Sequence, residues 1–238
     1  SDSNVQVTTG GNELLQPETS ENTSIGLIYI PTFIDDLSVT LDWYDIKINN
    51  AISEFGAQNN LDLCAFQNKN CEVITRNNLG EIDNVLDGPV NLNSITTSGM
   101  DVVMKYGIEN QSGNWNFSAN FSKLNELTEV ATLTDGTTEE KDLVGTAASR
   151  QSYPEWRGAI SANWKKDDWY ASYSARYIGE TTEMVSNEPR DISSITYHNI
   201  SGGYHFENGL SVKLGINNLA DKQPPSSLTN KNINFDQN

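Results

Sequence analysis

The sequence contains no run of about 18 consecutive apolar residues, the length that a membrane-spanning helix requires. A helical membrane protein is therefore excluded, although strands that cross membranes carry apolar residues at alternate positions and leave no such run. Basic residues are scarce, because 15 Lys and Arg stand against 32 Asp and Glu, which gives a net charge of −17. This charge repels a polyanion, so the sequence predicts no nucleic-acid partner.

Cysteine is nearly absent: Cys64 and Cys71 are the only two, and six residues separate them. The sequence has no CxxC pair and no Cys/His cluster, so we expect no zinc site. A disulfide that closes a small surface loop is the favoured interpretation, and it implies an oxidising compartment. Two unpaired thiols are the alternative.

A catalytic constellation is also missing. No GxSxG elbow occurs, and the two histidines, His198 and His205, fall on opposite parities of the predicted strand. His198 lies on the outward-facing parity, where a catalytic Ser–His pair in the wall of a barrel would lie. We favour the interpretation that His198 has no catalytic role, and catalysis by such a pair is the alternative. The acidic residues Glu139, Glu140 and Asp142 belong to no D-x-D-x-D-G loop, so we favour a solvated acidic surface over a calcium site. We expect no enzyme activity, no cofactor and no metal.

What the sequence does contain is alternation of apolar and polar residues with period two, which is typical of strands with two different faces. In residues 114–122, for example, every second residue is Trp, Phe or Ala and the others are Asn or Ser. In the segment 37–48 the apolar parity switches at Trp43–Tyr44, and either a bulge or an exit from the membrane explains the switch. Eight apolar rows are found, at 23–29, 37–43, 100–108, 115–121, 156–164, 169–177, 200–206 and 210–216.

The connections between these strands alternate between short and long. Short links are predicted at 31–36, 110–113, 166–168 and 208–209, and the Asn-Gly pair of the last is a strong hairpin signal. Long links are predicted at 49–94, 127–155 and 181–193, and they hold much of the acid. A sheet that is trimmed at one end and elaborated at the other is typical of outer-membrane barrels, with short periplasmic turns and long extracellular loops.

Aromatic residues gather at two levels along the predicted strands. Lipid–water interfaces select such levels, because an amphipathic ring settles at the depth of the headgroups. From Trp156 to Trp164 is eight residues, about 27 Å along a strand, which rises about 20 Å at a tilt of about 40°. The residues beside short turns are Tyr29, Tyr106, Trp115, Trp164, Trp169, Tyr204 and Phe206, and those near long loops are Trp43, Trp156 and Tyr177.

Two alternatives stay open at this point. A soluble, adhesive β-sandwich carries the same apolar rows on its inner faces, and a passive porin-like channel shares the barrel wall. The polar parity holds Asn, Ser, Gly and Thr more than Lys and Glu, as the lumen of a barrel does, which favours the barrel.

Four segments resemble TonB-dependent receptors, and together they span nearly the whole chain. The stretch Leu15-Gln16-Pro17-Glu18-Thr19-Ser20 with Ile25-Gly26 looks like the entry to a late barrel strand, and residues 37–48 are similar to the strand that follows. Ser98-Gly99-Met100-Asp101 matches the signature after a long loop. Residues 214–222, read Leu-Gly-Ile-Asn-Asn-Leu-Ala-Asp-Lys, resemble the sequence before the last extracellular loop.

The resemblance implies an all-β fold: residues 1–238 form an antiparallel transmembrane segment of about eight strands of a 22-stranded barrel. The chain starts Ser-Asp-Ser and ends Gln237–Asn238, so we expect a piece that lacks the N-terminal plug domain and the closing strand. Eight strands cannot cover both edges, so we expect that this piece does not function alone.

The implied function is active import across the outer membrane of a Gram-negative bacterium. The implied partners are outer-membrane lipid, the receptor's own plug domain, the TonB complex through the absent N-terminal region, and a small-molecule or oligosaccharide substrate, such as a siderophore. Arg76 and Tyr153 are candidate ligand contacts in the long loops. We expect the basic residues of the polar parity, Arg157, Lys165, Arg176 and Lys213, to contact the plug.

Overall fold

The structure, a computed structural model, describes residues 5–54, 56–91, 94–132, 137–148 and 151–228. It divides into two compact units, each assembled from three stretches of the chain. Unit 1 comprises Ser1–Asn22, Ile46–Thr97 and Leu127–Asp142, and unit 2 comprises Thr23–Asp45, Ser98–Glu126 and Leu143–Asn238.

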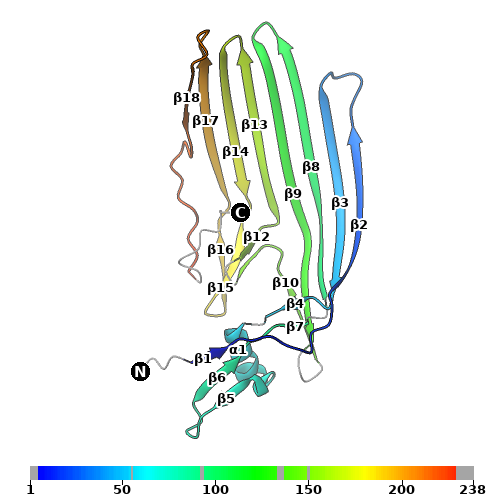
Figure 1. Cartoon of the computed structure of the whole chain (residues 1–238), viewed down its shortest axis with the longest axis vertical. Helices are drawn as coiled ribbons and strands as arrows, with labels where there is room; N and C mark the ends of the chain where they lie inside the picture. The colour runs from blue at the N-terminus through cyan, green and yellow to red at the C-terminus, as the bar shows by residue number, and fades with distance from the viewer. Residues whose placement is uncertain (1–4, 55, 92–93, 133–136, 149–150, 229–238) are drawn as a thin grey trace. The chain divides into compact units, whose positions relative to one another are not determined.

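A nine-stranded sheet is the main element of the fold, and its long strands run side by side as a meander (Figure 1). Eight strands follow the path β18-β17-β14-β13-β9-β8-β3-β2, and β10 pairs with β9 outside that path. The eight predicted strands are thus confirmed, and β2 and β18 are the two open ends of an unclosed barrel wall. The bounds are β2 (Thr19–Tyr29), β3 (Leu37–Asn49), β8 (Ser94–Asn110), β9 (Gly113–Thr132), β10 (Thr138–Asp142), β13 (Trp156–Lys166), β14 (Trp169–Ile178), β17 (Ile195–His205) and β18 (Ser211–Ile216).

Tight turns join the strands at the upper ends in Figure 1, and long connections join them at the other ends. Two residues separate β8 from β9 and two separate β13 from β14, where Asp167 adopts a positive φ of 51°. The predicted alternation of short and long links is confirmed. The long links differ from the prediction in being largely folded, because they contain small strands and one helix. The strand β9 also continues to Thr132, where β10 pairs with it, so the expected loop at 127–155 begins later.

The register places apolar residues opposite apolar ones and polar residues opposite polar ones. Ile160 of β13 stands opposite Ala119 of β9 and Ala175 of β14. Its neighbour Ser161 stands opposite Ser118. Because successive side chains of a strand point to opposite faces, the sheet has one apolar face and one polar face.

The apolar face is not the inside of a sandwich. Ile160 is 42% exposed, Ile200 45% and Leu214 76%. A soluble β-sandwich would pack these side chains between two sheets and remove them from solvent. These three side chains lie open instead, as on the outer face of a barrel wall, while the smaller Ala175 of the same face is buried.

The parity switch in β3 has a packing reason. Ile48, near the end of β3, packs with Val90 and Ile95 against the buried residues Ala51 and Ala131. Ile48 therefore contacts a small apolar cluster of unit 1. This contact explains why Ile48 is apolar, although it lies on the face of β3 that carries polar residues before Trp43.

Unit 1 also holds a small α/β element inside the link between β3 and β8. The helix α1 ends at Gln67, and its C-cap residue Asn68 has a left-handed φ of 56°. Leu63 and Val85 are buried here. No helix of the described residues is long and apolar enough to cross a membrane. The elements in this link are β4 (Ile52–Ser53), α1 (Ala57–Gln67), η1 (Cys71–Val73), β5 (Ile74–Arg76), β6 (Ile82–Leu86) and β7 (Val90–Asn91), and β1 (Gln6–Thr8), which precedes β2, joins them.

The strand β1 pairs in parallel with β6, and β5 pairs antiparallel with β6, so the order is β1-β6-β5. The segment before β2 thus completes a sheet whose other two strands follow β3. The strands β4 and β7 form a separate antiparallel pair.

Unit 2 contains a second small sheet in the order β12-β11-β15-β16. The strands β11 and β15 pair in parallel, and the other two pairs are antiparallel. Ala147 and Ile192 form a buried apolar contact within it. The bounds are β11 (Thr146–Ala148), β12 (Gln151–Tyr153), β15 (Thr181–Val185) and β16 (Glu188–Ile192).

Candidate functional site

The polar face of the large sheet carries hydrogen-bonded side chains, most of them Ser and Asn. The hydroxyls of Ser118 and Ser161 lie 2.8 Å apart, and the hydroxyl of Ser172 donates to Asn163 Oδ1 at 2.7 Å. Because these pairs face each other across adjacent strands, they form a continuous polar surface. Further bonds of this face join Asn199 to Ser174 and Ser122 to Asp101.

Two basic residues of this face have local partners. The guanidinium of Arg157 donates through Nη2 to the carbonyl of Ser152 at 2.8 Å, and so it ties β13 to β12. The guanidinium of Arg176 lies 5.4 Å from the ring centroid of Tyr197. The sequence analysis expected both residues to contact a plug, and it did not identify these contacts, of which one is five residues away in the chain and the other lies on the neighbouring strand β17.

Aromatic side chains meet beside the tight turns, on the parity of the apolar face. The ring centroids of Trp115 and Trp164 are 6.1 Å apart. Those of Trp169 and Tyr204 are 4.7 Å apart, as are those of Tyr204 and Phe206. The structure therefore brings together five of the aromatic residues that the sequence placed at this level. Of the other two, Tyr106 stacks on Phe117 at 6.3 Å and Tyr29 is 52% exposed at the end of β2.

The turns themselves are held to one another. The indole of Trp164 donates to the carbonyl of Ser112 at 2.8 Å, and Lys166 Nζ donates to the carbonyl of Gln111 at 2.9 Å. Gly113 has a φ of 119°, and a Cβ there would lie 2.8 Å from the Trp164 indole nitrogen. Only glycine fits this close approach.

Fewer aromatics mark the other level. Lys123 Nζ lies 5.6 Å from the ring centroid of Trp156 and 3.2 Å from Glu155 Oε1. Trp156 is 45% exposed. Trp43 and Tyr177 are half-buried in β3 and β14.

The predicted disulfide is present. Cys64 of α1 and Cys71 of η1 are bonded, with Cα atoms 4.8 Å apart, so the bond fastens the helix to the turn that follows it. Arg76 lies in the same element at the end of β5. Its Nη1 donates to the carbonyl of Gly80 at 3.0 Å across the β5–β6 turn, and its side chain is exposed.

Tyr153, the other candidate ligand contact, is in unit 2. It ends β12, its hydroxyl bonds to Gln151, and its carbonyl accepts from the backbone N–H of Gly145 at 2.8 Å. Arg76 and Tyr153 thus belong to different units, and each takes part in the local structure of its own loop.

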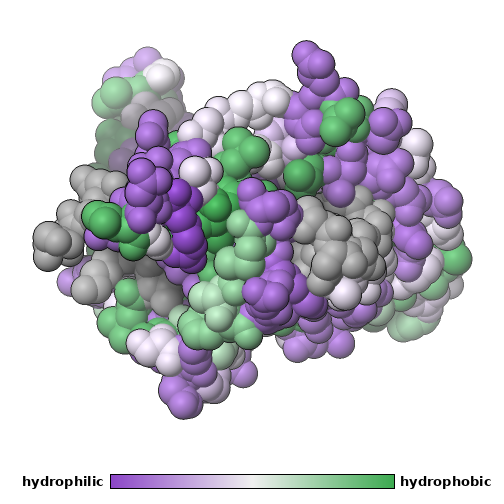
Figure 2. Space-filling view, turned by 90° about the horizontal axis from the view of Figure 1, so that it is seen from below, coloured by the Kyte–Doolittle hydropathy of each residue, from purple (hydrophilic) through white to green (hydrophobic). Residues whose placement is uncertain are grey.

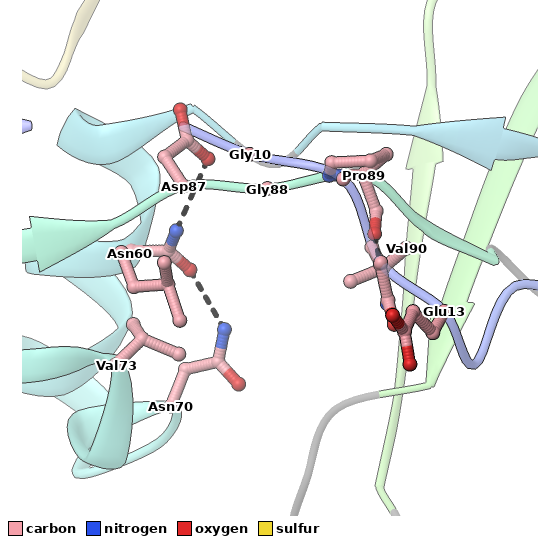
Figure 3. A pocket seen from close by; sticks show the side chains of 12 residues that line it. Gly10, Glu13, Asn60, Asn70, Val73, Asp87, Gly88, Pro89 and Val90 are labelled. Atoms are coloured by element: carbon pink, nitrogen blue, oxygen red, sulfur yellow. Dashed lines mark hydrogen bonds between the residues drawn. The ribbon is translucent and has the colours of Figure 1, made fainter. Parts of the chain in front are cut away.

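A cavity of about 390 Å³ in unit 1 was not predicted. Figure 3 shows Asn60, Asn70 and Val73 on one side of it and Glu13 and Val90 on the other. Its walls come from the segments 10–13, 60–73 and 86–90, and no local sequence pattern connects the three. We call it the loop cavity.

Glu183 of β15 is a second feature that the sequence did not signal. Its side chain is completely buried and accepts hydrogen bonds from Arg190 Nη1, Ser227 Oγ at 2.6 Å and the backbone N–H of Leu228 at 3.0 Å. Arg190 also donates to the carbonyl of Ser226 at 3.1 Å. Because a buried carboxylate requires such partners, Glu183 fixes residues 226–228 to the β15–β16 hairpin.

The histidines take part in separate pairs. His198 Nδ1 lies 2.8 Å from the Tyr173 hydroxyl, and His205 Nδ1 lies 2.7 Å from the Ser211 hydroxyl. Within the described ranges, no group of three or more His, Cys, Asp or Glu is placed to hold a metal ion.

In Figure 2 hydrophilic residues cover most of the visible surface, with smaller hydrophobic areas between them.

Comparison with protein families gives one match, to the family described as TonB dependent receptor-like, beta-barrel, over residues 2–219. No curated protein matches the chain significantly.

Solved structures share the fold. The ferric enterobactin receptor of Pseudomonas aeruginosa, a mutant in complex with enterobactin, is 16% identical with a TM-score of 0.61, over 92% of this chain and 28% of that chain. The siderophore receptor PirA of Acinetobacter baumannii is 16% identical with a TM-score of 0.60, over 92% and 30%. The FrpB iron transporter of Neisseria meningitidis is 13% identical with a TM-score of 0.59, over 90% and 29%. This chain thus spans less than a third of each of these proteins.

Proposed function

The chain belongs to the TonB-dependent receptor-like β-barrel family, and from this premise we propose that it forms part of the wall of an outer-membrane receptor that imports a scarce solute. The observation that carries the proposal is the two-faced sheet, whose apolar side chains are exposed on one side while hydroxyl and amide groups pair on the other. Lipid can cover the first face and a wet interior the second.

The aromatic residues support a defined position in the bilayer. We assign Tyr29, Tyr106, Trp115, Trp164, Trp169, Tyr204 and Phe206 to one lipid–water interface and Trp43, Trp156 and Tyr177 to the other. In this assignment the tight turns face the periplasm and the long connections face the outside, in the outer membrane of a Gram-negative bacterium.

The complete receptor requires more than this wall. We propose that a plug domain lies inside the barrel against the polar face, that further strands complete the wall, and that energy comes from the TonB complex. The open ends at β2 and β18 support the need for further strands, because unpaired edges expose backbone donors and acceptors.

The solute is proposed to be a siderophore or an oligosaccharide. Iron and siderophore receptors among the similar structures support the first class. The acidic character of the chain supports a solute without negative charge, and therefore the second class. Arg76 and Tyr153 are proposed ligand contacts of the long connections.

The test is growth of a strain from which the gene is deleted, on panels of iron chelates and glycans as limiting nutrients. The receptor function predicts that growth on one solute requires both the gene and an intact TonB. A passive porin-like channel predicts uptake that persists without TonB, and this outcome would reject active import.

A further inference from the structure

The loop cavity has a polar wall that is unusual for a surface connection. Asn70 Nδ2 donates to Asn60 Oδ1 at 2.7 Å, and Asn60 Nδ2 is 3.5 Å from Asp87 Oδ1, which also accepts from the backbone N–H of Gly56 at 3.0 Å. Asn60, Asn70 and Asp87 are only 3%, 6% and 8% exposed. The network therefore holds its members in fixed orientations beside the cavity (Figure 3).

The wall keeps hydrogen-bonding capacity. A carboxamide can make four hydrogen bonds, two as donor and two as acceptor. Asn60 uses its side chain once as donor and once as acceptor. A ligand that both donates and accepts at the same atom, as a hydroxyl does, matches this remaining capacity.

The charge of the lining selects against anions. All twelve lining residues are described; Glu13 and Asp87 carry carboxylates, and none is Lys, Arg or His. An anionic ligand would therefore meet only like charge. Val73, Val90 and Pro89 supply apolar surface between the polar groups, as small-molecule sites commonly do, and the volume of about 390 Å³ suits a small ligand.

We infer that the loop cavity binds an uncharged, hydroxyl-rich ligand, a sugar unit by its chemistry. This inference rests on the proposed import function and selects one of its two solute classes. It assigns Asn60, Asn70 and Asp87 to the hydroxyl groups of the ligand, and the Gly10–Gly11 backbone is a further part of the lining.

Gly11 offers a clean steric test. A Cβ at Gly11 meets no atom within 4 Å, and its φ lies outside the left-handed range, so larger residues fit without backbone strain. Gly11→Phe places a ring at the cavity, whereas Gly11→Ala adds one methyl group. Leu79→Phe is the matched control, because Leu79 is 84% exposed in the β5–β6 turn and does not line the cavity.

Binding is measured by calorimetry on the full-length receptor in detergent, with neutral di- and trisaccharides of glucose and xylose as probes and a ferric tricatecholate complex as the anionic comparison. We expect a neutral probe to bind, Gly11→Phe to weaken it by about tenfold or more, and Gly11→Ala and Leu79→Phe to leave it unchanged.

Failure of every neutral probe to bind, or equal binding by the Gly11→Phe variant, overturns the inference. TonB-dependent growth on an iron chelate together with such a failure leaves the import function intact. A neutral probe that binds at the cavity without any TonB-dependent uptake retains the cavity assignment and rejects the import function instead.

Discussion

The indole nitrogen of Trp164 donates a hydrogen bond to the backbone carbonyl of Ser112, 2.8 Å away, and this bond joins two neighbouring tight turns of the sheet. The Trp164 ring also meets Trp115. Trp164 thus has two roles: its ring contacts another aromatic residue, and its N–H links two turns. A substitution that keeps a ring but removes the N–H separates these roles.

Trp164→Phe keeps an aromatic ring but removes the N–H donor. We expect a loss of about 0.5–1.5 kcal/mol in the free energy of unfolding, the usual net value of one hydrogen bond. Trp169→Phe is the control, since the indole of Trp169 has no such turn contact among the described residues. Urea titration of the full receptor in lipid vesicles measures both variants. Equal losses would show that ring size matters and the hydrogen bond does not.

Ile160→Arg tests which face meets lipid. Ile160 lies near the middle of β13 on the exposed apolar face, where an arginine in the bilayer should cost about 2–4 kcal/mol. Ser161→Arg, on the polar face one residue later, should be far milder because a wet interior hydrates the charge. Folding titrations into vesicles compare the two, and equal tolerance would contradict the assignment of the faces.

Glu183→Gln tests the anchoring of residues 226–228. The amide removes the negative charge that Arg190, Ser227 and the Leu228 N–H share, and we expect the local stability to fall by about 1–3 kcal/mol. Hydrogen exchange should become faster at the Leu228 amide, while the strands of the large sheet keep their protection. Glu188→Gln, exposed on the same hairpin, is the control. Unchanged exchange at Leu228 would show that other contacts hold this segment.

Removal of the disulfide should loosen unit 1 locally. Cys64→Ser with Cys71→Ser removes a short-loop cross-link that is worth about 2–3 kcal/mol in the chain-entropy view. Limited trypsin digestion should then cut faster after Lys69, which lies between the two cysteines, and not after Lys105 in β8. Protection of Lys69 in the variant would mean that the packing of Leu63 and Val85 suffices.

Period-two alternation was enough to predict the large sheet, because each strand has one lipid-compatible face and one polar face over most of its length. It failed where the long connections fold. The strand β9 runs on to Thr132 because β10 pairs with it, and such pairing depends on a partner that alternation does not identify.

The site features were less accessible from sequence than the fold. Glu183 stands among polar residues and looks like a solvated acid, yet contacts with residues more than 40 positions later bury it. Asn60 of α1 and the loop residues Asn70 and Asp87 likewise carry no sequence signal of their own, and only the fold brings them together. The aromatic contacts beside the tight turns could be anticipated, because Trp115, Trp164 and Trp169 stand next to recognisable turns in the sequence, whereas the assignment of the aromatic residues to two lipid interfaces stays a prediction.

The parallel pairing of β1 with β6 makes one folding element of two connections that the strands β2 and β3 separate in the chain. Here a transplant of residues 49–94 alone would carry β6 away from its partner and leave a bare edge. The graft has to include residues 6–18, and natural variation in one of the two connections should be accompanied by variation in the other.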